Sequence, residues 1–289
     1  MNIVYLNNIK VSPNNKISLY NGSFLYGINC FEGVRGYYVE EKKETKIFLL
    51  DEHLDRLYSS IKYLKFNFSI KKNKLKSDIY NIIDKEKIKE DIYIRITVFV
   101  GSDSSWAETD DIEYFISIRS MKSNLNKILN RKLFISKYKR ITKNSIPPSI
   151  KAGANYLNSR YSKLEAISNG FDDSLMLTNN NFISESSGSC IFFIKDDSLY
   201  TPSLNCDILG SITRSFILNN SKNIFNYIFE DEIKVSDLSN FDCCFVVGTM
   251  IELQLISKIN EINYNNNSTL LKRFIKEFTL NIKKKLHQN

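Results

Sequence analysis

The segment Ser145–Ala166, SIPPSIKAGANYLNSRYSKLEA, decides how the chain is interpreted, because it places a lysine in unusual company. Lys151 follows two prolines and an isoleucine and precedes alanine and glycine, whereas most lysines of this chain lie among polar or charged residues. Pro147 and Pro148 impose an extended approach, and Gly153 permits unusual backbone angles or a close approach to a bound group. A lone lysine usually lies on a solvated surface. The segment alone therefore indicates only that the Lys151 side chain projects from a backbone of defined shape.

Length and composition indicate a globular protein with room for two domains. The chain has 289 residues, 43% of them hydrophobic and 12% aromatic, which is enough for substantial cores. Its formal net charge is +8, but the lysines are scattered and form no basic stripe interleaved with aromatic residues. The charge is therefore weak support for a nucleic-acid partner, and none is predicted.

The cysteines and the N-terminal residues predict a reduced, cytoplasmic protein. The five cysteines form no CxxC pair, and with only two histidines they assemble no zinc-ligand set, so no metal is predicted. The first residues, MNIVYLNNIKVSPNNK, lack the basic start and apolar core of a signal peptide, and no apolar run reaches membrane-spanning length. We expect a cytoplasmic location and no membrane association.

Hydrophobic periodicity predicts a first domain of mixed strands and helices over residues 1–120. Apolar residues recur at helical spacing from Leu54 to Leu64 behind a possible cap at Asp51, and a second helix is expected around Ile79. The segments DIYIRITVFVG and IEYFISIRS are typical of long strands. The polar segment 121–130 is the candidate linker.

Residues 131–289 predict a second domain in which strands predominate. After Lys151, a helix is expected to place Leu157, Tyr161, Leu164 and Ile167 on one side and to end at Gly170. Strands are expected at SLML, FIS, CIFFIKDDSLYT and CCFVVG, with a short helix at SITRSFILNN and a closing amphipathic helix. No GxGxxG or P-loop motif occurs, so a Rossmann or P-loop enzyme is not predicted.

Several segments, taken in order, resemble the fold-type IV (class IV) pyridoxal-phosphate-dependent aminotransferases, and most closely the branched-chain amino acid aminotransferases. The resemblance spans nearly the whole chain and rests on these segments: YGINCFEGVRGY (26–37), LDEHLDRLYSS (50–60), YIR (93–95), IKAGANYLNS (150–159), ISESSG (183–188), SITR (211–214) and VGTMIE (247–252). It implies a two-domain α/β (α+β) fold with a smaller N-terminal domain and a larger, mainly β C-terminal domain that binds pyridoxal 5'-phosphate, with the cofactor in the cleft between domains and a homodimer as the assembly.

The resemblance assigns the catalytic lysine and the groups that bind the cofactor ring. It implies that Lys151 bonds to the cofactor aldehyde, which a primary amine does reversibly, and then shuttles the substrate α-proton as base and acid. Glu185 is implied to pair with the pyridine nitrogen and keep it protonated. Tyr156 is implied to lie beside the phenolic oxygen.

The phosphate and the substrate have implied binding groups of their own. A guanidinium, helix-terminal amides and a hydroxyl suit a phosphate, and the resemblance places them at Arg56, Ile212, Thr213 and Thr249. Substrate contacts are implied for Tyr26, Phe31, Gly33, Arg35, Tyr93, Arg95, Thr249 and Met250. Met250 and Ile251 depart from the small residues common after the family's GT pair, which puts the substrate range in question.

The implied reaction is transamination between a branched-chain L-amino acid (leucine, isoleucine or valine) and 2-oxoglutarate. A D-amino acid or (R)-amine transaminase, or an aminodeoxychorismate-lyase-like enzyme, would keep Lys151, Glu185 and Arg56 and remains an alternative. A non-catalytic basic binding protein is the alternative from another class.

Overall fold

The computed structural model describes residues 1–101, 105–125, 127 and 129–288. The chain divides into two compact units. The first comprises the described residues of 1–123, 150–154 and 286–289, and the second those of 124–149 and 155–285. The domain boundaries predicted at 120 and 130 stay a prediction. The short segment around Lys151 belongs to the first unit.

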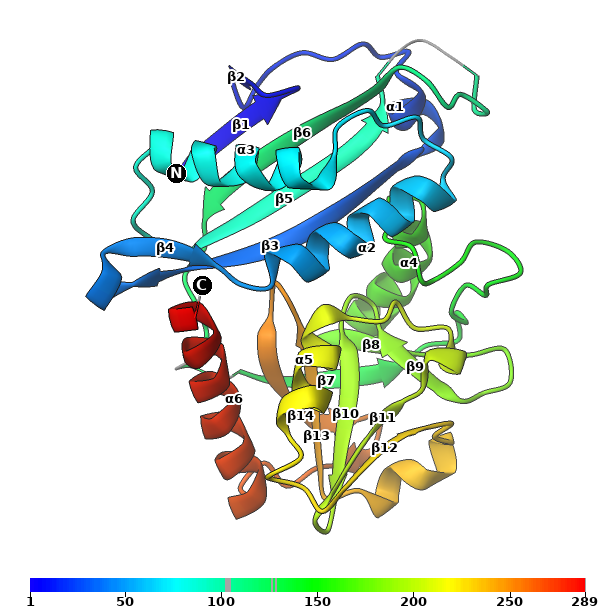
Figure 1. Ribbon diagram of the computed structural model, residues 1–289. Helices are drawn as coiled ribbons and strands as arrows, with labels where there is room; N and C mark the ends of the chain where they lie inside the picture. Colours follow the sequence, from blue (N-terminus) through cyan, green and yellow to red (C-terminus); the bar gives the residue numbers. More distant parts are fainter. Residues whose placement is uncertain (102–104, 126, 128, 289) are drawn as a thin grey trace. The chain divides into compact units, whose positions relative to one another are not determined.

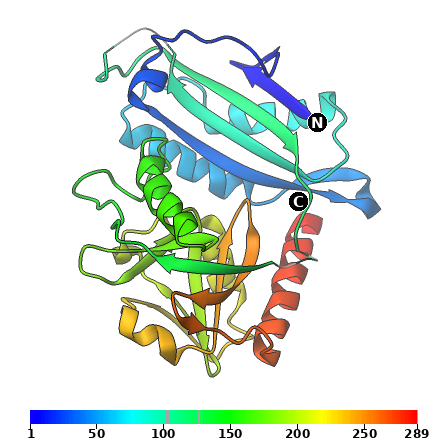
Figure 2. The same cartoon turned by 180° about the vertical axis from the view of Figure 1, so that it is seen from behind.

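A six-stranded sheet forms the first unit, in the order β2-β1-β6-β5-β3-β4 with every neighbouring pair antiparallel. Its elements are β1 (Asn2–Leu6), β2 (Ile9–Val11), α1 (Gly22–Tyr26), β3 (Asn29–Val39), β4 (Glu44–Ile47), α2 (Leu50–Tyr63), α3 (Lys72–Lys85), β5 (Ile92–Val100) and β6 (Ile112–Ser120). Helices α2 and α3 cover the same face of this sheet: they lie in front of it in Figure 1 and behind it in Figure 2.

Helix α2 confirms the helix predicted from periodicity, because Leu54, Leu57 and Ile61 are all buried against the sheet core. The predicted cap at Asp51 is wrong. The cap residue is Leu49, two positions earlier, and the helix begins at Leu50. Leu49 has a left-handed backbone (φ 53°) and its side chain makes no cap hydrogen bond. Asp51 lies in the first turn, where a carboxylate suits the helix dipole.

A nine-stranded mixed sheet forms the second unit, in the order β12-β11-β10-β13-β14-β7-β8-β9 with β15 paired to β14. Its elements are β7 (Asn130–Ile135), α4 (Asn155–Ser168), β8 (Asp173–Leu177), β9 (Ile183–Ser186), β10 (Cys190–Lys195), β11 (Ser198–Pro202), α5 (Ile212–Asn220), β12 (Tyr227–Asp231), β13 (Cys243–Gly248), β14 (Glu252–Ile259), β15 (Ile262–Asn263) and α6 (Thr269–Gln288). Short 3₁₀ turns occur at Glu40–Lys42, Leu204–Cys206 and Val235–Asn240. The pairs β11/β12, β14/β7 and β7/β8 are parallel.

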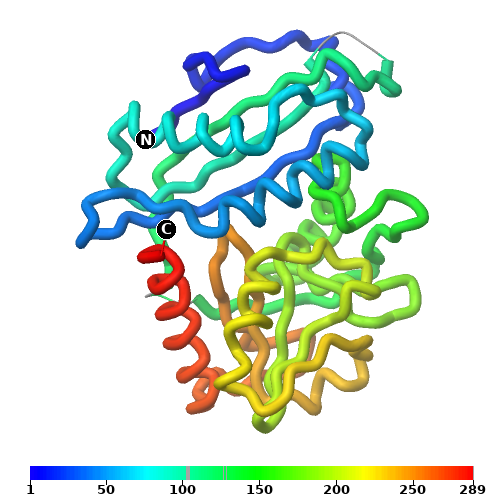
Figure 3. Tube along the Cα trace, viewed as in Figure 1, coloured from blue at the N-terminus to red at the C-terminus, as the bar shows by residue number. Residues whose placement is uncertain are grey.

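Aromatic stacking joins the sheet of the second unit to its last helix. Phe192 stacks on Phe245 with ring centroids 5.2 Å apart, and Phe245 meets Phe274 of α6 at 4.9 Å. Figure 3 traces α6 as the continuous red helix at the end of the chain. This confirms the predicted closing amphipathic helix, whose Phe278 is also buried.

Helix α4 buries the face opposite to the one that its apolar residues suggest. The predicted stripe of Leu157, Tyr161, Leu164 and Ile167 is 46–57% exposed, whereas the buried positions are Asn155, Ser159, Ser162 and Ala166. The helix is followed, as predicted, by Gly170 with a left-handed backbone (φ 78°). Over the part of the chain that the structure describes, we find no helix with the length and apolarity needed to span a bilayer.

Candidate active site

Lys151 is held through both of its backbone polar groups. Its carbonyl oxygen accepts a hydrogen bond from the Phe31 N–H at 3.0 Å, and its own N–H donates to Ser60 Oγ at 3.2 Å. The segment pairs with the start of β3 through the Cys30–Ala152 bridge and the bond from Gly153 N–H to the Asn29 oxygen at 3.0 Å. The lysine backbone is therefore fixed between β3 and α2.

Gly153 is needed for a close approach within the protein. A Cβ at this position would lie 2.5 Å from Asn29 Oδ1 and 2.8 Å from Nδ2. The sequence suggested either unusual backbone angles or proximity to a bound group. Gly153 does not have a positive φ. The group that approaches it closely is the Asn29 side chain of the protein itself.

Strand β3 directs alternate residues to opposite faces of its sheet. Phe31, Gly33 and Arg35 pair directly with Thr97, Arg95 and Tyr93 of β5. The Phe31 ring meets two cations: the Arg95 guanidinium carbon lies 3.6 Å and Lys151 Nζ 5.1 Å from its centroid. Both distances are within the range of cation–π attraction, so one aromatic ring orients the lysine and an arginine.

The other predicted substrate residues of this face have defined contacts within the first unit. A Cβ on Gly33 would lie 2.1 Å from Tyr93 Oη, so the glycine leaves room for the tyrosine ring. Arg35 is buried and donates to the carbonyl oxygens of Met121 (2.6 Å) and Lys122 (3.2 Å). Arg95 also donates from Nε to Thr97 Oγ1 at 3.1 Å.

On the opposite face, Glu32 of β3 joins two residues of α2. Its carboxylate accepts from Arg56 Nε at 2.6 Å and Nη2 at 2.9 Å, and lies 2.8 Å from His53 Nδ1. Burial would raise the pKa of Glu32, but the Arg56 charge and the His53 hydrogen bond lower it to about 2. The pKa of His53 is lowered, first by burial and also by the Arg56 and Lys151 charges, although Glu32 acts in the opposite direction.

These charges define the hydrogen bonds of the cluster. An ionised carboxylate only accepts, so the neutral His53 must carry its proton on Nδ1 and donate it to Glu32. The pair of Glu32 and Arg56 is then electrically balanced within a nearly closed site, where the Arg56 side chain is only 13% exposed. Arg56 is thereby held as an oriented, permanent cation.

In the second unit, Glu185 of β9 has a buried arginine partner. Arg140 Nη2 lies 2.7 Å from Glu185 Oε1, and both side chains are 7% exposed. Oε2 accepts from the Leu209 N–H at 3.3 Å and from Cys190 Sγ at 3.8 Å. The arrangement keeps a carboxylate at the position predicted to meet the pyridine nitrogen.

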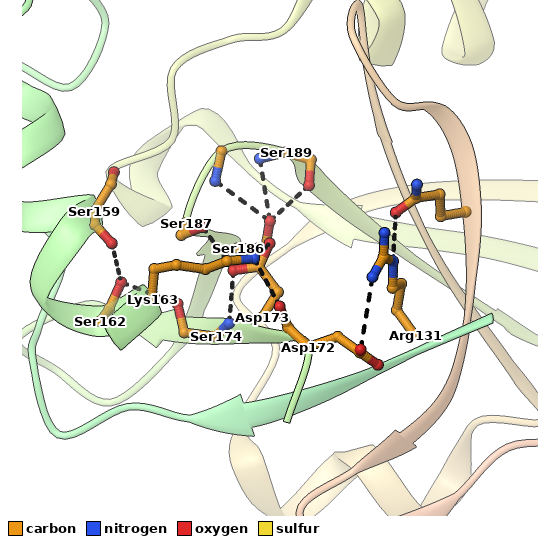
Figure 4. A network of polar contacts seen from close by, with 12 residues as sticks. Arg131, Ser159, Ser162, Lys163, Asp172, Asp173, Ser174, Ser186, Ser187 and Ser189 are labelled. Carbon is orange, nitrogen blue, oxygen red and sulfur yellow. Dashed lines mark hydrogen bonds and ion pairs between the residues drawn. The ribbon is translucent and has the colours of Figure 1, made fainter. Parts of the chain in front are cut away.

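Serine side chains anchor the turn that follows Glu185 (Figure 4). Ser186 and Ser189 share a hydroxyl–hydroxyl bond of 2.6 Å, and Ser187 Oγ donates to Asp173 Oδ1 at 2.6 Å. Lys163 of α4 reaches Asp173 Oδ2 at 3.2 Å. The turn, β8 and α4 are therefore connected by polar contacts, which explains the serine-rich ISESSG segment.

The remaining predicted cofactor groups of the second unit lie at a helix start and in a turn. Ser211 caps α5 by accepting from the Arg214 N–H at 3.4 Å, so Ile212 and Thr213 occupy the first turn, whose amides lack partners within the helix. Thr249 and Met250 form the turn between β13 and β14. Helix amides and a hydroxyl are donors that fit a phosphate.

Tyr26 and Tyr156 lie on exposed surfaces. Tyr26, at the end of α1, is 48% exposed and makes an edge contact with Trp106 at 6.1 Å. Tyr156, in the first turn of α4, is 43% exposed. Their assignment to the cofactor and the side-chain pocket stays a prediction.

Sequence reasoning missed the residues that hold the predicted ones. Glu32 and His53 lie inside the motif segments 26–37 and 50–60, which predicted roles only for their neighbours. The available signal was a glutamate within an apolar strand. Arg140 and Ser60 gave no signal, because their partners are 45 and 91 positions away in the chain.

Comparison with known proteins identifies the family. The family model for amino-transferase class IV matches residues 29–259. The probable branched-chain-amino-acid aminotransferase of Aquifex aeolicus is 30% identical over 254 residues, covering 87% of this chain and 82% of that protein. Both findings confirm the resemblance inferred from the motifs.

Solved structures show the same fold. The branched-chain amino acid aminotransferase of Escherichia coli aligns with a TM-score of 0.88 at 26% identity, covering 96% of this chain and 93% of the other. That of Thermobaculum terrenum, in its PLP form, aligns at 0.91 over 99% and 95% of the two chains; at 24% identity it supports the fold alone. The chain therefore belongs to the class IV aminotransferases, a family of pyridoxal-phosphate-dependent transaminases with a mixed α/β fold.

Proposed function

We propose that this enzyme transfers the amino group of a branched-chain L-amino acid (leucine, isoleucine or valine) to 2-oxoglutarate, giving the 2-oxo acid and L-glutamate. The observation that carries the proposal is the Phe31 ring, with Lys151 Nζ at 5.1 Å and the Arg95 guanidinium at 3.6 Å. An apolar surface beside the reactive amine suits a leucine side chain. The adjacent cation suits the second carboxylate of glutamate, which would otherwise be buried without a partner.

The residues present fit pyridoxal phosphate. Bound in the site, the cofactor supplies an electron sink for the breaking Cα–H bond of the substrate. We assign its phosphate to Arg56, Ile212, Thr213 and Thr249, and its ring nitrogen to Glu185. The ion pairs to Glu32 and Arg140 support these assignments, since they hold the Arg56 and Glu185 side chains in fixed orientations.

Lys151 carries the catalytic role in this proposal. Its amine takes the substrate α-proton as a general base and then, once protonated, donates a proton as a general acid. The backbone bonds to Phe31 and Ser60 limit the positions from which Nζ acts. The Phe31 ring on one side keeps water from part of the amine.

Substrate recognition follows from the same face of the first sheet and from one turn of the second unit. We assign the α-carboxylate to Tyr93 and to the amides around Thr249 and Met250, and the side-chain pocket to Tyr26, Phe31 and Tyr156. Gly33 contributes by leaving room for Tyr93, and Arg35 by fixing the backbone at 121–122.

A panel of amine donors tests the proposed reaction. The purified, cofactor-loaded enzyme is assayed with 2-oxoglutarate and the L and D forms of leucine, isoleucine, valine and alanine. We expect the three branched L-amino acids to be the best donors. Preference for D-amino acids or (R)-amines would contradict this substrate assignment and favour the other activities of the fold.

The apolar stripe of α4 supports a homodimer. Leu157, Tyr161, Leu164 and Ile167 are about half exposed on a helix whose polar face is buried, which is typical of a surface that a partner covers. We assign the partner to a second copy, as the family resemblance implies. Light scattering should give a dimer mass, and Leu164→Lys should shift it toward the monomer; an unchanged dimer would remove α4 from the interface.

A further inference from the structure

Ser60 occupies a position that no motif indicated. It is a buried residue of α2, 1% exposed, four positions after Arg56. Its hydroxyl donates to the Arg56 carbonyl oxygen at 3.1 Å and accepts from the Lys151 N–H at 3.2 Å. One oxygen atom therefore connects the backbones of Lys151 and Arg56, the two residues to which the proposed function assigns the catalytic amine and the cofactor phosphate.

A hydroxyl is the group that this position requires. It has one proton to donate and two lone pairs to accept with. Donation to the carbonyl four residues earlier is a common local bond of helical serines, and here it turns a lone pair toward Lys151. Alanine would keep the helix, which it favours, but would leave the Lys151 amide without the acceptor that it has in this buried setting.

Strand β3 holds the other side of the lysine segment. The Phe31 N–H bonds to the Lys151 carbonyl, and the Gly153 N–H bonds to Asn29. These bonds do not involve Ser60, so its hydroxyl can be removed with the β3 pairing kept. What is lost is the attachment of the lysine to α2, the helix that carries Arg56.

We propose that Ser60 is a positioning residue that fixes Lys151 with respect to Arg56, so that the reactive amine and the phosphate anchor keep a constant separation. The inference rests on the proposed roles of these two residues. Misplacement of a reacting group by about 1 Å can lower a rate by about 10²-fold, so a single hydroxyl is sufficient to matter.

Ser59 provides a matched control in the same helix. Its hydroxyl makes the same kind of bond, to the Asp55 carbonyl oxygen at 2.9 Å, but on the exposed side of α2. Ser59→Ala thus removes an equivalent helix bond and leaves the lysine contact intact. Ser60→Thr keeps a hydroxyl at the position, and Ser60→Cys is a volume-matched substitute should Ser60→Ala not fold.

The experiment compares these variants as holoenzymes and as cofactor-free proteins. Single-turnover rates with leucine are followed by the visible absorbance of the cofactor. They should fall about tenfold or more for Ser60→Ala, because the activation free energy rises when the amine is misplaced. Ser60→Thr should recover most of the rate and Ser59→Ala should match the parent. In the cofactor-free protein, deuterium exchange of the peptide that contains Lys151 should accelerate in Ser60→Ala alone.

The outcomes separate this inference from the proposed function. A Ser60→Ala rate or exchange profile equal to that of Ser59→Ala, or a loss that Ser60→Thr does not repair, would overturn the role of Ser60. Lys151→Ala is measured alongside. If that variant still transaminates, the assignment of the lysine is wrong whatever Ser60 does.

Discussion

Two buried arginine–carboxylate pairs, one in each unit, use the same interaction for opposite purposes. In the first unit, Glu32 holds Arg56, and we propose the arginine as the cofactor ligand. In the second, Arg140 holds Glu185, and we propose the carboxylate as the ligand. In both, the group assigned to the cofactor is held in place by a buried partner of opposite sign. The partner is therefore as much a part of the site as the ligand.

The largest expected effect comes from breaking either pair. Glu32→Gln would leave the Arg56 charge uncompensated, and Arg140→Gln would leave the Glu185 charge uncompensated. Each substitution should lower the free energy of unfolding of the cofactor-free protein by about 3–5 kcal/mol. Urea unfolding measures this loss. The exposed pair of Lys72 and Asp55, 2.5 Å apart, is the control: Lys72→Gln should cost less than about 1 kcal/mol.

The double variants sharpen this result. Replacing both members of a pair, as in Glu32→Gln with Arg56→Gln, removes both charges together, so the combined loss should be smaller than the sum of the two single losses. Additive losses would show that the two side chains do not stabilise one another.

Arg56→Ala tests the ligand in the first pair. Loss of one charged hydrogen-bonding partner should weaken cofactor retention by about 1.5–3 kcal/mol. Dialysis against a cofactor scavenger measures the retention. Arg131→Ala, which removes an arginine paired with Asp172 at 3.6 Å, is the control and should retain cofactor like the parent. Equal retention in both variants would remove Arg56 from the phosphate site.

Arg95 extends the comparison to an arginine held by an aromatic ring and a hydroxyl. We expect Arg95→Met to slow the half-reaction with glutamate about tenfold or more relative to that with leucine, because only glutamate brings a second carboxylate. Single-turnover spectra with each amino acid provide the rates. Equal losses would mean that Arg95 is structural or binds the α-carboxylate common to both.

His53 should give the smallest effect, through pH. Its pKa is lowered from 6.5 in the folded protein, mainly by burial. The unfolded chain therefore binds a proton at this residue near pH 6.5 while the folded one does not, so stability falls as the pH drops below that value. His53→Asn should remove this part of the pH dependence, as measured by unfolding at pH 7.5 and 5.5. The separate contribution of Glu32, whose pKa is lowered from 4.5 to about 2, is lost only over that more acidic range.

Local periodicity predicted much of the fold but not which faces the chain covers. Helix α2 and the closing helix were correct because their apolar residues pack on their own unit. In α4 the same kind of pattern identified residues on one face, yet that face is exposed. Apolar periodicity indicates which residues share one face of a helix, but whether that face is buried depends on which elements pack against it. Strands β12 and β14 were not predicted.

The site residues likewise fall into those that the local sequence predicted and those that only the tertiary structure shows. Motifs located Lys151, Arg56 and Glu185, because their chemistry is recognisable from a short segment. They did not locate Glu32, Arg140 or Ser60. The contacts of these residues depend on how β3 packs against α2 and on chain segments that are distant in sequence. Pairing of this kind is a property of tertiary structure.

The attachment site of the cofactor tests the central claim most directly. The holoenzyme is reduced with borohydride, digested, and its peptides are analysed by mass spectrometry. Our account predicts a pyridoxyl-phosphate group on Lys151 and none in the Lys151→Ala variant. The same modification on another lysine, such as Lys163 of α4, or a reduced adduct that persists in Lys151→Ala, would contradict it.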